Sequence, residues 1–214
     1  GGASRKKRAQ YEPGNAVELS WSARLEEQLG RFTVAETINS RAGRYLDRPE
    51  ALTAITTIAA LLRDAVDEGD AAGSALYGPT TLLLDALETW PVWPALYARW
   101  ELGLLSALGF GLDLTKCALS GANNGLTHVS PKTGRAVCGS EAEGYVDRLF
   151  RLPAFLIDPA AIAMAEDIQD ALALTGYFLE ARLFAAVHKP LPSARARLVP
   201  KQPRPRKEKA CVPG

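Results

Sequence analysis

The chain has 214 residues, 47% of them hydrophobic, which suits one ordinary domain or a small domain fused to a larger one. Its apolar runs are too short to span a bilayer, none opens the chain as a signal peptide would, and its three cysteines show no paired spacing. We therefore expect a cytoplasmic protein without a membrane partner. The net charge of +1 divides into +4 on residues 5–8, +6 on residues 195–214 and −9 between them, which favours a polyanionic partner, although basic ends can also be merely solubilising.

Residues 1–40 predict a basic segment followed by a β-hairpin. Pro13-Gly14-Asn15 is a turn signal that opens the first strand. Apolar and polar side chains alternate in Val17–Trp21 and again in Arg31–Glu36, which is the period of half-buried strands. A two-stranded hairpin is marginal on its own in water. We therefore expect the strands that complete this sheet to precede Gly1, so that the chain is a fragment or a mis-started product.

From Arg48 onward the sequence takes the period of helices, and four are predicted. Their limits are Pro49 to Gly69 or Gly73, about Ser74 to Leu87, Pro91 or Pro94 to Leu108, and Ala160 to about Val187. The inward face of the first helix is predicted to carry Leu52, Ile55, Ile58, Ala59, Leu62 and Val66. Because such helices can cover one another's apolar faces, the body is predicted to be a helical domain.

A polar insert and a basic tail interrupt and close this helical pattern. Residues 112–145 contain several Gly, Asn and Pro turn signals, and His128–Ser130 and Arg135–Val137 have the length of a small hairpin. Residues 200–214 are rich in Pro, Lys and Arg, which predicts a disordered basic tail.

Four segments of the chain, in order, resemble the RecO family. The most specific runs from Arg99 to Gly121: an Arg-Trp-Glu-Leu helix ends in Leu-Gly-Phe and leads into a turn that contains Cys117. Val129–Val137 is similar to the hairpin of that family, and Lys189–Arg195 to its closing Pro-Leu-x-Ser-Arg pattern. Gly2–Gly14 resembles the basic loop and turn late in its N-terminal barrel.

This resemblance implies a mainly α fold with a small β part. A partial N-terminal OB-fold, present as a β-hairpin remnant, would occupy residues 1–40, and a helical domain residues 41–199, with a degenerate zinc-hairpin insert at 112–145. It also implies a DNA repair and recombination mediator of the RecF pathway, cytoplasmic and nucleoid-associated. Such a protein binds single- and double-stranded DNA, the C-terminal tail of single-strand-binding protein and RecR, and promotes RecA loading and strand annealing.

Many members of that family hold zinc, but this chain departs from the required pattern. A structural zinc site takes four thiolate or imidazole ligands, usually from paired Cys-x-x-Cys motifs. The corresponding positions here read Cys117-Ala118-Leu119-Ser120 and Cys138-Gly139-Ser140-Glu141, so each motif keeps one cysteine. Even with His128 recruited the set is incomplete. We therefore expect neither zinc nor another cofactor, with Cys117 and Cys138 as a degenerate remnant.

DNA contacts are expected at the N-terminal end. The candidates are Arg5, Lys6, Lys7, Arg8 and Arg31. Basic side chains in a loop contact phosphates without reading sequence, and OB-folds add aromatic rings on which bases stack. Tyr11 is a lesser candidate for such stacking. Trp21 stands at a strand position, where burial in a core is the expected alternative.

Arg99 and Trp100 are the candidates for binding a protein partner. In the RecO family a hydrophobic groove on the helical domain takes up the acidic, Phe-ending tail of single-strand-binding protein, which requires an apolar pocket and a cation for the terminal carboxylate. Arg99 could supply that cation, or it could instead form an ion pair with Glu101 or Asp113.

Catalysis finds little support in the sequence. Neither of the two histidines stands in a triad or in metal-ligand spacing, and no phosphate-binding glycine loop follows a predicted strand. We therefore expect a protein that is not an enzyme. A DNA-binding mediator is the first hypothesis, and an adaptor that binds proteins but little DNA, because its barrel is truncated, is the second. A zinc-dependent enzyme would need an open metal position that the ligand count does not support.

Overall fold

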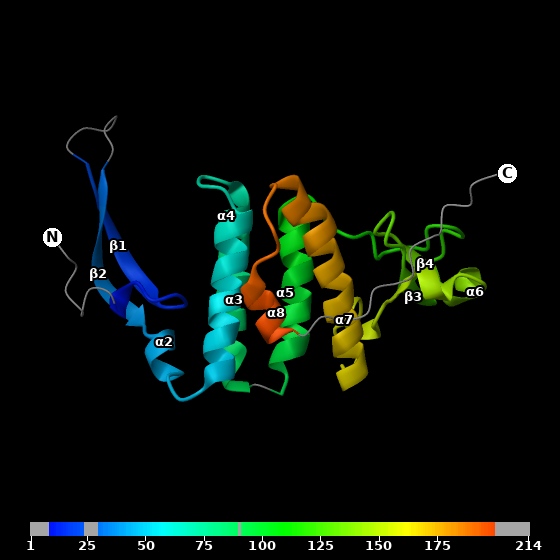
Figure 1. The fold of residues 1–214 in the computed structure, drawn as a ribbon, viewed down its shortest axis with the longest axis horizontal. Coiled ribbons are helices and arrows are strands. Elements are labelled where there is room, and N and C mark those ends of the chain that lie inside the picture. The colour runs from blue at the N-terminus through cyan, green and yellow to red at the C-terminus, as the bar shows by residue number, and fades with distance from the viewer. Residues whose placement is uncertain (1–8, 24–29, 90, 200–214) are drawn as a thin grey trace.

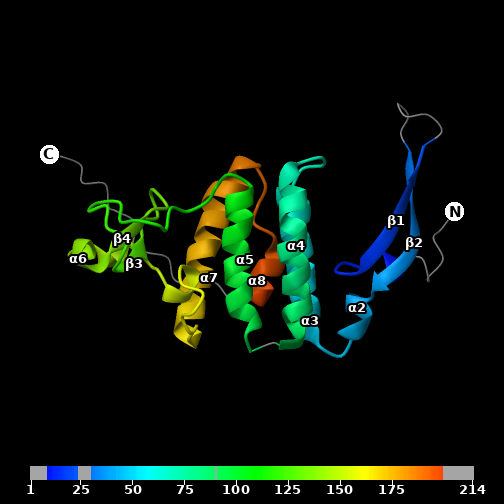
Figure 2. The same cartoon turned by 180° about the vertical axis from the view of Figure 1, so that it is seen from behind.

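The computed structural model describes residues 9–23, 30–89 and 91–199. A β-hairpin stands at one end of the long axis, a body of helices forms the middle, and a small sheet lies at the other end (Figures 1 and 2). The prediction of a mainly helical chain with a small β part is thus confirmed.

The hairpin pairs β1 (Ala16–Ser22) with β2 (Arg31–Asn39) in antiparallel register, as the alternation predicted. Within the described residues it has no third strand, and its being part of an OB-fold remains a prediction. Gly14 precedes β1 with φ +86°, and a Cβ there would lie 2.7 Å from Ile55 of the first long helix. Only glycine allows this close approach of the turn to the helical body.

The helical body begins with a short helix and two long ones. These are α2 (Arg41–Arg44), α3 (Pro49–Ala65) and α4 (Ala71–Asp85), which is followed by the 3-10 turn η1 (Ala86–Thr89). Helix α4 starts earlier than predicted because the Asp70 carboxylate accepts a hydrogen bond from the Ala72 amide at 2.8 Å and caps it. Gly73 therefore lies in its first turn, and Pro79 is inside the helix.

The buried face of α3 is broader than the predicted stripe. Ile55 and Ile58 are buried as expected, while Leu62 is only partly buried. Leu61, absent from the prediction, is fully buried. The C-terminal helix α8 (Ser193–Leu198) packs against α3 in addition to the rest of the core, so a single-faced stripe underestimated the buried face.

Two further helices complete the body: α5 (Trp93–Ala107) and α7 (Ala165–Phe178). Pro94 lies in the first turn of α5, which settles the choice between Pro91 and Pro94. Helix α7 begins after the predicted Ala160, because its N-terminus is capped at Met164, whose amide donates to the Asp167 carboxylate at 3.2 Å. It continues as the π-helical segment η4 (Leu179–Phe184).

A buried ion pair fastens α8 to the centre of this body. Arg195 donates to both oxygens of the Glu101 carboxylate, from Nε at 2.6 Å and from Nη2 at 2.8 Å, and Thr175 donates to the same carboxylate. Burial alone would lower the pKa of Arg195, but the charge of Glu101 outweighs it and raises that pKa. Burial and then the same carboxylate raise the pKa of Tyr97. The pair joins α5, α7 and α8 at one point.

The small sheet has the order β4-β3-β5 and packs on the body. Its elements, with the short helices around them, are β3 (Leu126–Val129), β4 (Ala136–Cys138), α6 (Gly139–Ala142), η2 (Val146–Arg148), β5 (Phe150–Arg151) and η3 (Ala154–Leu156). The predicted hairpin corresponds to β3 and β4, whereas β5 was not foreseen. Phe150 of β5 contacts the rings of Tyr177 and Phe178 on α7, so the sheet shares the core of the helices. None of the helices described is both long and apolar enough to cross a membrane.

Candidate functional site

The two residues predicted to bind a protein partner line one groove. This α4–α5 groove has a volume of about 370 Å³ and is formed almost entirely by apolar side chains. Its lining residues are Ala75, Leu76, Pro79, Leu82, Leu83, Leu96, Arg99, Trp100, Gly103 and Ala107. Arg99 is the only charged residue among these ten. Leu82 is 73% exposed, so part of the apolar lining faces solvent.

Arg99 does not form the ion pair that was its alternative role. Its guanidinium instead donates from Nε and Nη2 to the backbone carbonyl of Phe155, at 2.9 and 2.6 Å, and lies 5.7 Å from the centre of that ring. Glu101 is paired with Arg195, and Asp113 with Arg135. Carbonyls do not neutralise a guanidinium, so Arg99 stays a cation held in one orientation, and within the described residues its Nη1 makes no hydrogen bond.

Trp100 has a different position in the same groove. Its side chain is only 5% exposed, and its indole N–H donates to the Thr80 hydroxyl at 3.0 Å. The ring therefore ties α5 to α4 from below and forms part of the floor of the groove. The structure offers a partner the exposed side chain of Leu82 beside the nearly buried Trp100.

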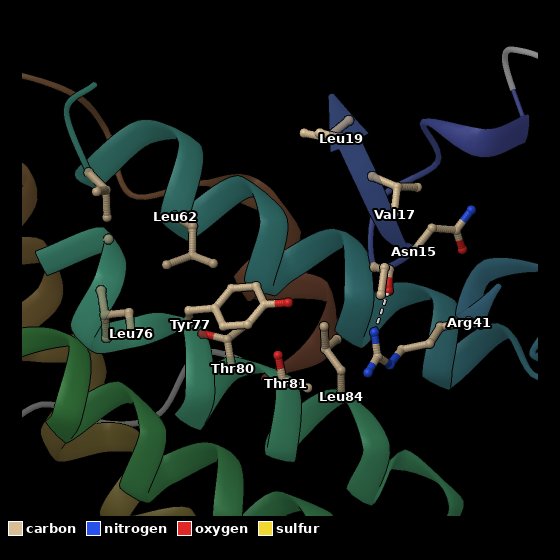
Figure 3. Close-up of a pocket in the computed structure, with 14 residues that line it drawn as sticks. Asn15, Val17, Leu19, Arg41, Leu62, Leu76, Tyr77, Thr80, Thr81 and Leu84 are labelled. Atoms are coloured by element: carbon tan, nitrogen blue, oxygen red, sulfur yellow. Dashed lines mark hydrogen bonds between the residues drawn. The ribbon is translucent and has the colours of Figure 1, made fainter. Parts of the chain in front are cut away.

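A second concavity, the hairpin hollow, separates the β-hairpin from α3 and α4 (Figure 3). It measures about 460 Å³. Figure 3 shows Val17 and Leu19 on one side and Leu62, Leu76 and Tyr77 on the other. At one end Arg41 donates to the Gly14 carbonyl at 3.0 Å and pairs with Asp85 at 2.7 Å. Arg41 thus connects the turn before the hairpin to helix α4 through polar contacts.

The hairpin carries an exposed aromatic pair beside Arg31. Trp21 and Phe32 face each other across the strands with ring centres 4.7 Å apart, and they are 54% and 63% exposed. The expectation that Trp21 is a core residue is wrong, because no second layer covers this face within the described residues. The Trp21 ring lies over Gly30, where a Cβ would come within 2.4 Å of it. Arg31 is exposed and Tyr11 is 60% exposed, while Arg5, Lys6, Lys7 and Arg8 lie outside the described residues.

The two cysteines of the zinc-motif positions meet in the insert. The Cys138 amide donates to the Cys117 sulfur at 3.2 Å, and the Ser120 hydroxyl lies 3.7 Å from the Cys138 sulfur. His128 instead contacts the Thr127 hydroxyl through Nδ1, at 2.9 Å. In the part of the chain that the structure describes, no three His, Cys, Asp or Glu side chains gather as metal ligands would.

The environments of the two thiols shift their pKa values in opposite directions. Burial would raise the pKa of Cys117, but hydrogen bonds from the Ser120 side chain and from backbone amides, among them that of Cys138, outweigh it and lower the pKa to about 6. For Cys138 burial prevails, and the neighbouring Cys117 adds to it, so that pKa is raised. Cys117 therefore ionises more readily than Cys138.

Sequence reasoning missed several residues of these surfaces. Phe32 could have been found from the sequence, since it follows Arg31 and pairs with Trp21 across the predicted hairpin. Leu82 was counted only as part of an apolar run, and Tyr77 was not considered. Both became candidates only when the packing of α4 was known, because a helical period does not show which side chains border a groove.

Together the described residues define a helical protein with an apolar α4–α5 groove, a hairpin hollow, an exposed aromatic hairpin and a small packed sheet. The family model described as recombination protein O C terminal matches residues 46–190, and the chain belongs to the RecO family. A protein named DNA repair protein RecO from Hyphomonas neptunium is 66% identical over 199 residues, which cover 93% of this chain and 82% of the relative.

Two other relatives carry the same name. The one from Ruegeria sp. is 46% identical over 202 residues, and the one from Paracoccus denitrificans 48% identical over 200 residues. They are covered over 82% and 80% of their lengths, and each matches 93% of this chain. No solved structure matches the chain. Membership of the family supports a function in DNA repair.

Proposed function

We propose that this chain is a non-catalytic mediator of DNA repair and recombination in the RecF pathway. In this role it binds DNA and the C-terminal tail of single-strand-binding protein, joins RecR, and promotes RecA loading and strand annealing. The observation that carries the proposal is the α4–α5 groove, in which an apolar lining is combined with the fixed cation of Arg99.

The chemistry of the groove fits an acidic peptide that ends in an aromatic residue. An apolar side chain of the peptide would enter between Leu82 and the edge of Trp100, and the terminal carboxylate would meet the Nη1 face of Arg99. Since the carbonyls of Phe155 and Asp158 already orient the guanidinium, little side-chain entropy is lost on binding. The hairpin supplies a second surface, where Trp21 and Phe32 can stack on bases and Arg31 can contact phosphate.

Peptide binding tests the groove. A fluorescent acidic peptide with a C-terminal Phe should bind the wild type in a fluorescence anisotropy titration, and Leu82→Glu should weaken binding at least about tenfold by placing a like charge in the groove. Leu119→Glu is the matched control, because Leu119 is an exposed leucine of the insert and outside the groove; it should bind as the wild type does. Amidation of the peptide C-terminus should also weaken binding. Equal affinity of the two variants contradicts this site.

A second candidate function is that of an adaptor which binds proteins but little DNA. It is favoured by the hairpin, which has only two strands within the described residues and so offers a small nucleic-acid surface. Fluorescence titration with single-stranded DNA at two salt concentrations separates the two functions, since phosphate contacts weaken steeply with salt. Salt-sensitive binding in the micromolar range supports the mediator, and its absence together with peptide binding supports the adaptor.

A further inference from the structure

The base of the insert holds two cysteines in an arrangement that the proposed function does not use. Cys117 lies in the turn before β3, and Cys138 is the last residue of β4. The Cys138 amide donates to the Cys117 sulfur at 3.2 Å, and the Ser120 hydroxyl lies 3.7 Å from the Cys138 sulfur. One backbone amide and one hydroxyl thus connect the two side chains. Both cysteines are free thiols and both are buried, so a peroxide reaches them only when the surrounding turn opens locally.

Backbone hydrogen bonds fix this neighbourhood. The Ala118 amide donates to the Ala136 carbonyl at 2.8 Å, and the Cys117 amide to the Ala122 carbonyl at 2.7 Å. Because the Cys138 nitrogen lies 3.2 Å from the Cys117 sulfur, ordinary bond lengths put the two Cα atoms at most about 7.5 Å apart, close to the span of about 4.4–6.8 Å that disulfides bridge. Rotation of the two side chains with a small backbone shift would join the sulfurs.

We propose that Cys117 and Cys138 form a reversible dithiol–disulfide couple that is oxidised by hydroperoxides. The Cys117 thiolate attacks the peroxide oxygen, the O–O bond breaks, and after protonation an alcohol or water leaves, so that Cys117 becomes a sulfenic acid. The Cys138 thiol then attacks this sulfur, an S–S bond forms, and water leaves with the proton of Cys138. Two thiols are oxidised by two electrons and one peroxide is reduced. A thiol reductant reverses the change.

The environment assigns separate roles to the two cysteines. Cys117 receives hydrogen bonds from Ser120 and from backbone amides, which stabilise its thiolate and lower its pKa to about 6. Cys138, with a raised pKa, stays a thiol until a sulfenic acid forms beside it. Cys138 also donates to the Asn124 carbonyl at 3.2 Å, and this contact is lost on oxidation. The disulfide would lock the turn that carries Cys117 to the end of β4.

Thiol counting in the full chain tests the proposal. The third cysteine of the sequence, Cys211, is first replaced by serine. In this Cys211→Ser background, hydrogen peroxide should remove the Cys117 and Cys138 thiols in equal amounts, and dithiothreitol should restore them. Peptide mass spectrometry should find a Cys117–Cys138 link within one chain. Cys138→Ser should accumulate a sulfenic acid at Cys117 that dimedone traps, while Cys117→Ser should leave Cys138 far slower to react. Ser120→Ala should slow disulfide formation several-fold.

Three outcomes would overturn this inference. They are two thiols that persist after peroxide treatment, links only between chains, and stoichiometric zinc in the untreated protein, since both sulfurs would then be metal ligands. Because the first measurement uses cysteines in their native positions, a variant that fails to fold does not obscure the result. The test is independent of peptide or DNA binding, so it can succeed or fail whatever the fate of the proposed function.

Discussion

In the described part of the chain two small antiparallel sheets lie at opposite ends, and they are stabilised in different ways (Figure 1). In the sheet β4-β3-β5 the side chains of Val129, Ala136 and Phe150 are buried in the common core. In the hairpin β1–β2 the large side chains Trp21 and Phe32 are more than half exposed. Strand length does not explain the contrast, since the hairpin has the longer strands. The contrast arises because the side chains of the β4-β3-β5 sheet pack against the helices, whereas Trp21 and Phe32 do not.

The largest expected effect compares one substitution in the two sheets. Phe150→Ala should reduce the free energy of unfolding by about 3–5 kcal/mol, because it empties a site that Tyr177 and Phe178 enclose. Phe32→Ala should cost about 1 kcal/mol or less, since it removes one cross-strand ring contact at the surface. Urea unfolding followed by circular dichroism measures both. Similar costs would mean that the hairpin has a covering layer and that the contrast is wrong.

A smaller effect is expected at the junction between the hairpin and the helices. Arg41→Met removes the bonds to the Gly14 carbonyl and to Asp85, whose side chain is 48% exposed and can be hydrated afterwards. We expect a loss of about 1–2 kcal/mol and faster hydrogen exchange of the β1 and β2 amides, read by mass spectrometry. Arg63→Met on α3 is the control: its exposed ion pair is with the adjacent Asp64 and does not involve the hairpin, so little should change. Unaltered exchange in Arg41→Met would show that the hairpin is held by other contacts.

The same contrast explains how far the sequence could be read. Both hairpins were predicted because alternation and turn residues are local signals, and the helices because their period is local. Strand β5 has two residues, too few for any period, and exists because Phe150 packs on α7. The partner of Glu101 is Arg195, far along the chain, so no spacing rule could join them. The predicted burial of Trp21 was wrong for a related reason. Alternating apolar and polar side chains predict that a strand has an apolar face, but not whether a second layer covers that face.

The candidate site also has a part that was predicted from the sequence and a part that only the structure revealed. Arg99 and Trp100 were predicted from a resemblance, and they do line one groove. Much of the apolar lining of that groove comes from α4, and Leu82 could not be assigned to it because the packing of α4 against α5 is not a local signal. The carbonyl of Phe155, which holds Arg99, belongs to a 3-10 turn that the sequence did not indicate. The resemblance thus located the charged residue, and only the fold supplied its surroundings.

The smallest expected effect is a pH dependence confined to the packed sheet. Burial, and secondarily the charge of Arg151 on the neighbouring strand, lower the pKa of His128 below its ordinary value of 6.5. The unfolded chain therefore binds a proton at His128 at a higher pH than the folded chain does. The stabilisation is complete above pH 6.5 and is lost as the pH falls from there through the lower folded pKa.

Titration followed by the imidazole proton resonances in NMR should give His128 a midpoint below 6.5, with His128→Gln identifying the signal. In that variant the urea midpoint should fall less between pH 7 and pH 5 than it does in the wild type. The hairpin, which has no histidine, should contribute nothing to this difference. A midpoint at or above 6.5 would show that solvent and not the core surrounds β3. The packed sheet would then resemble the exposed hairpin more closely than its buried side chains indicate.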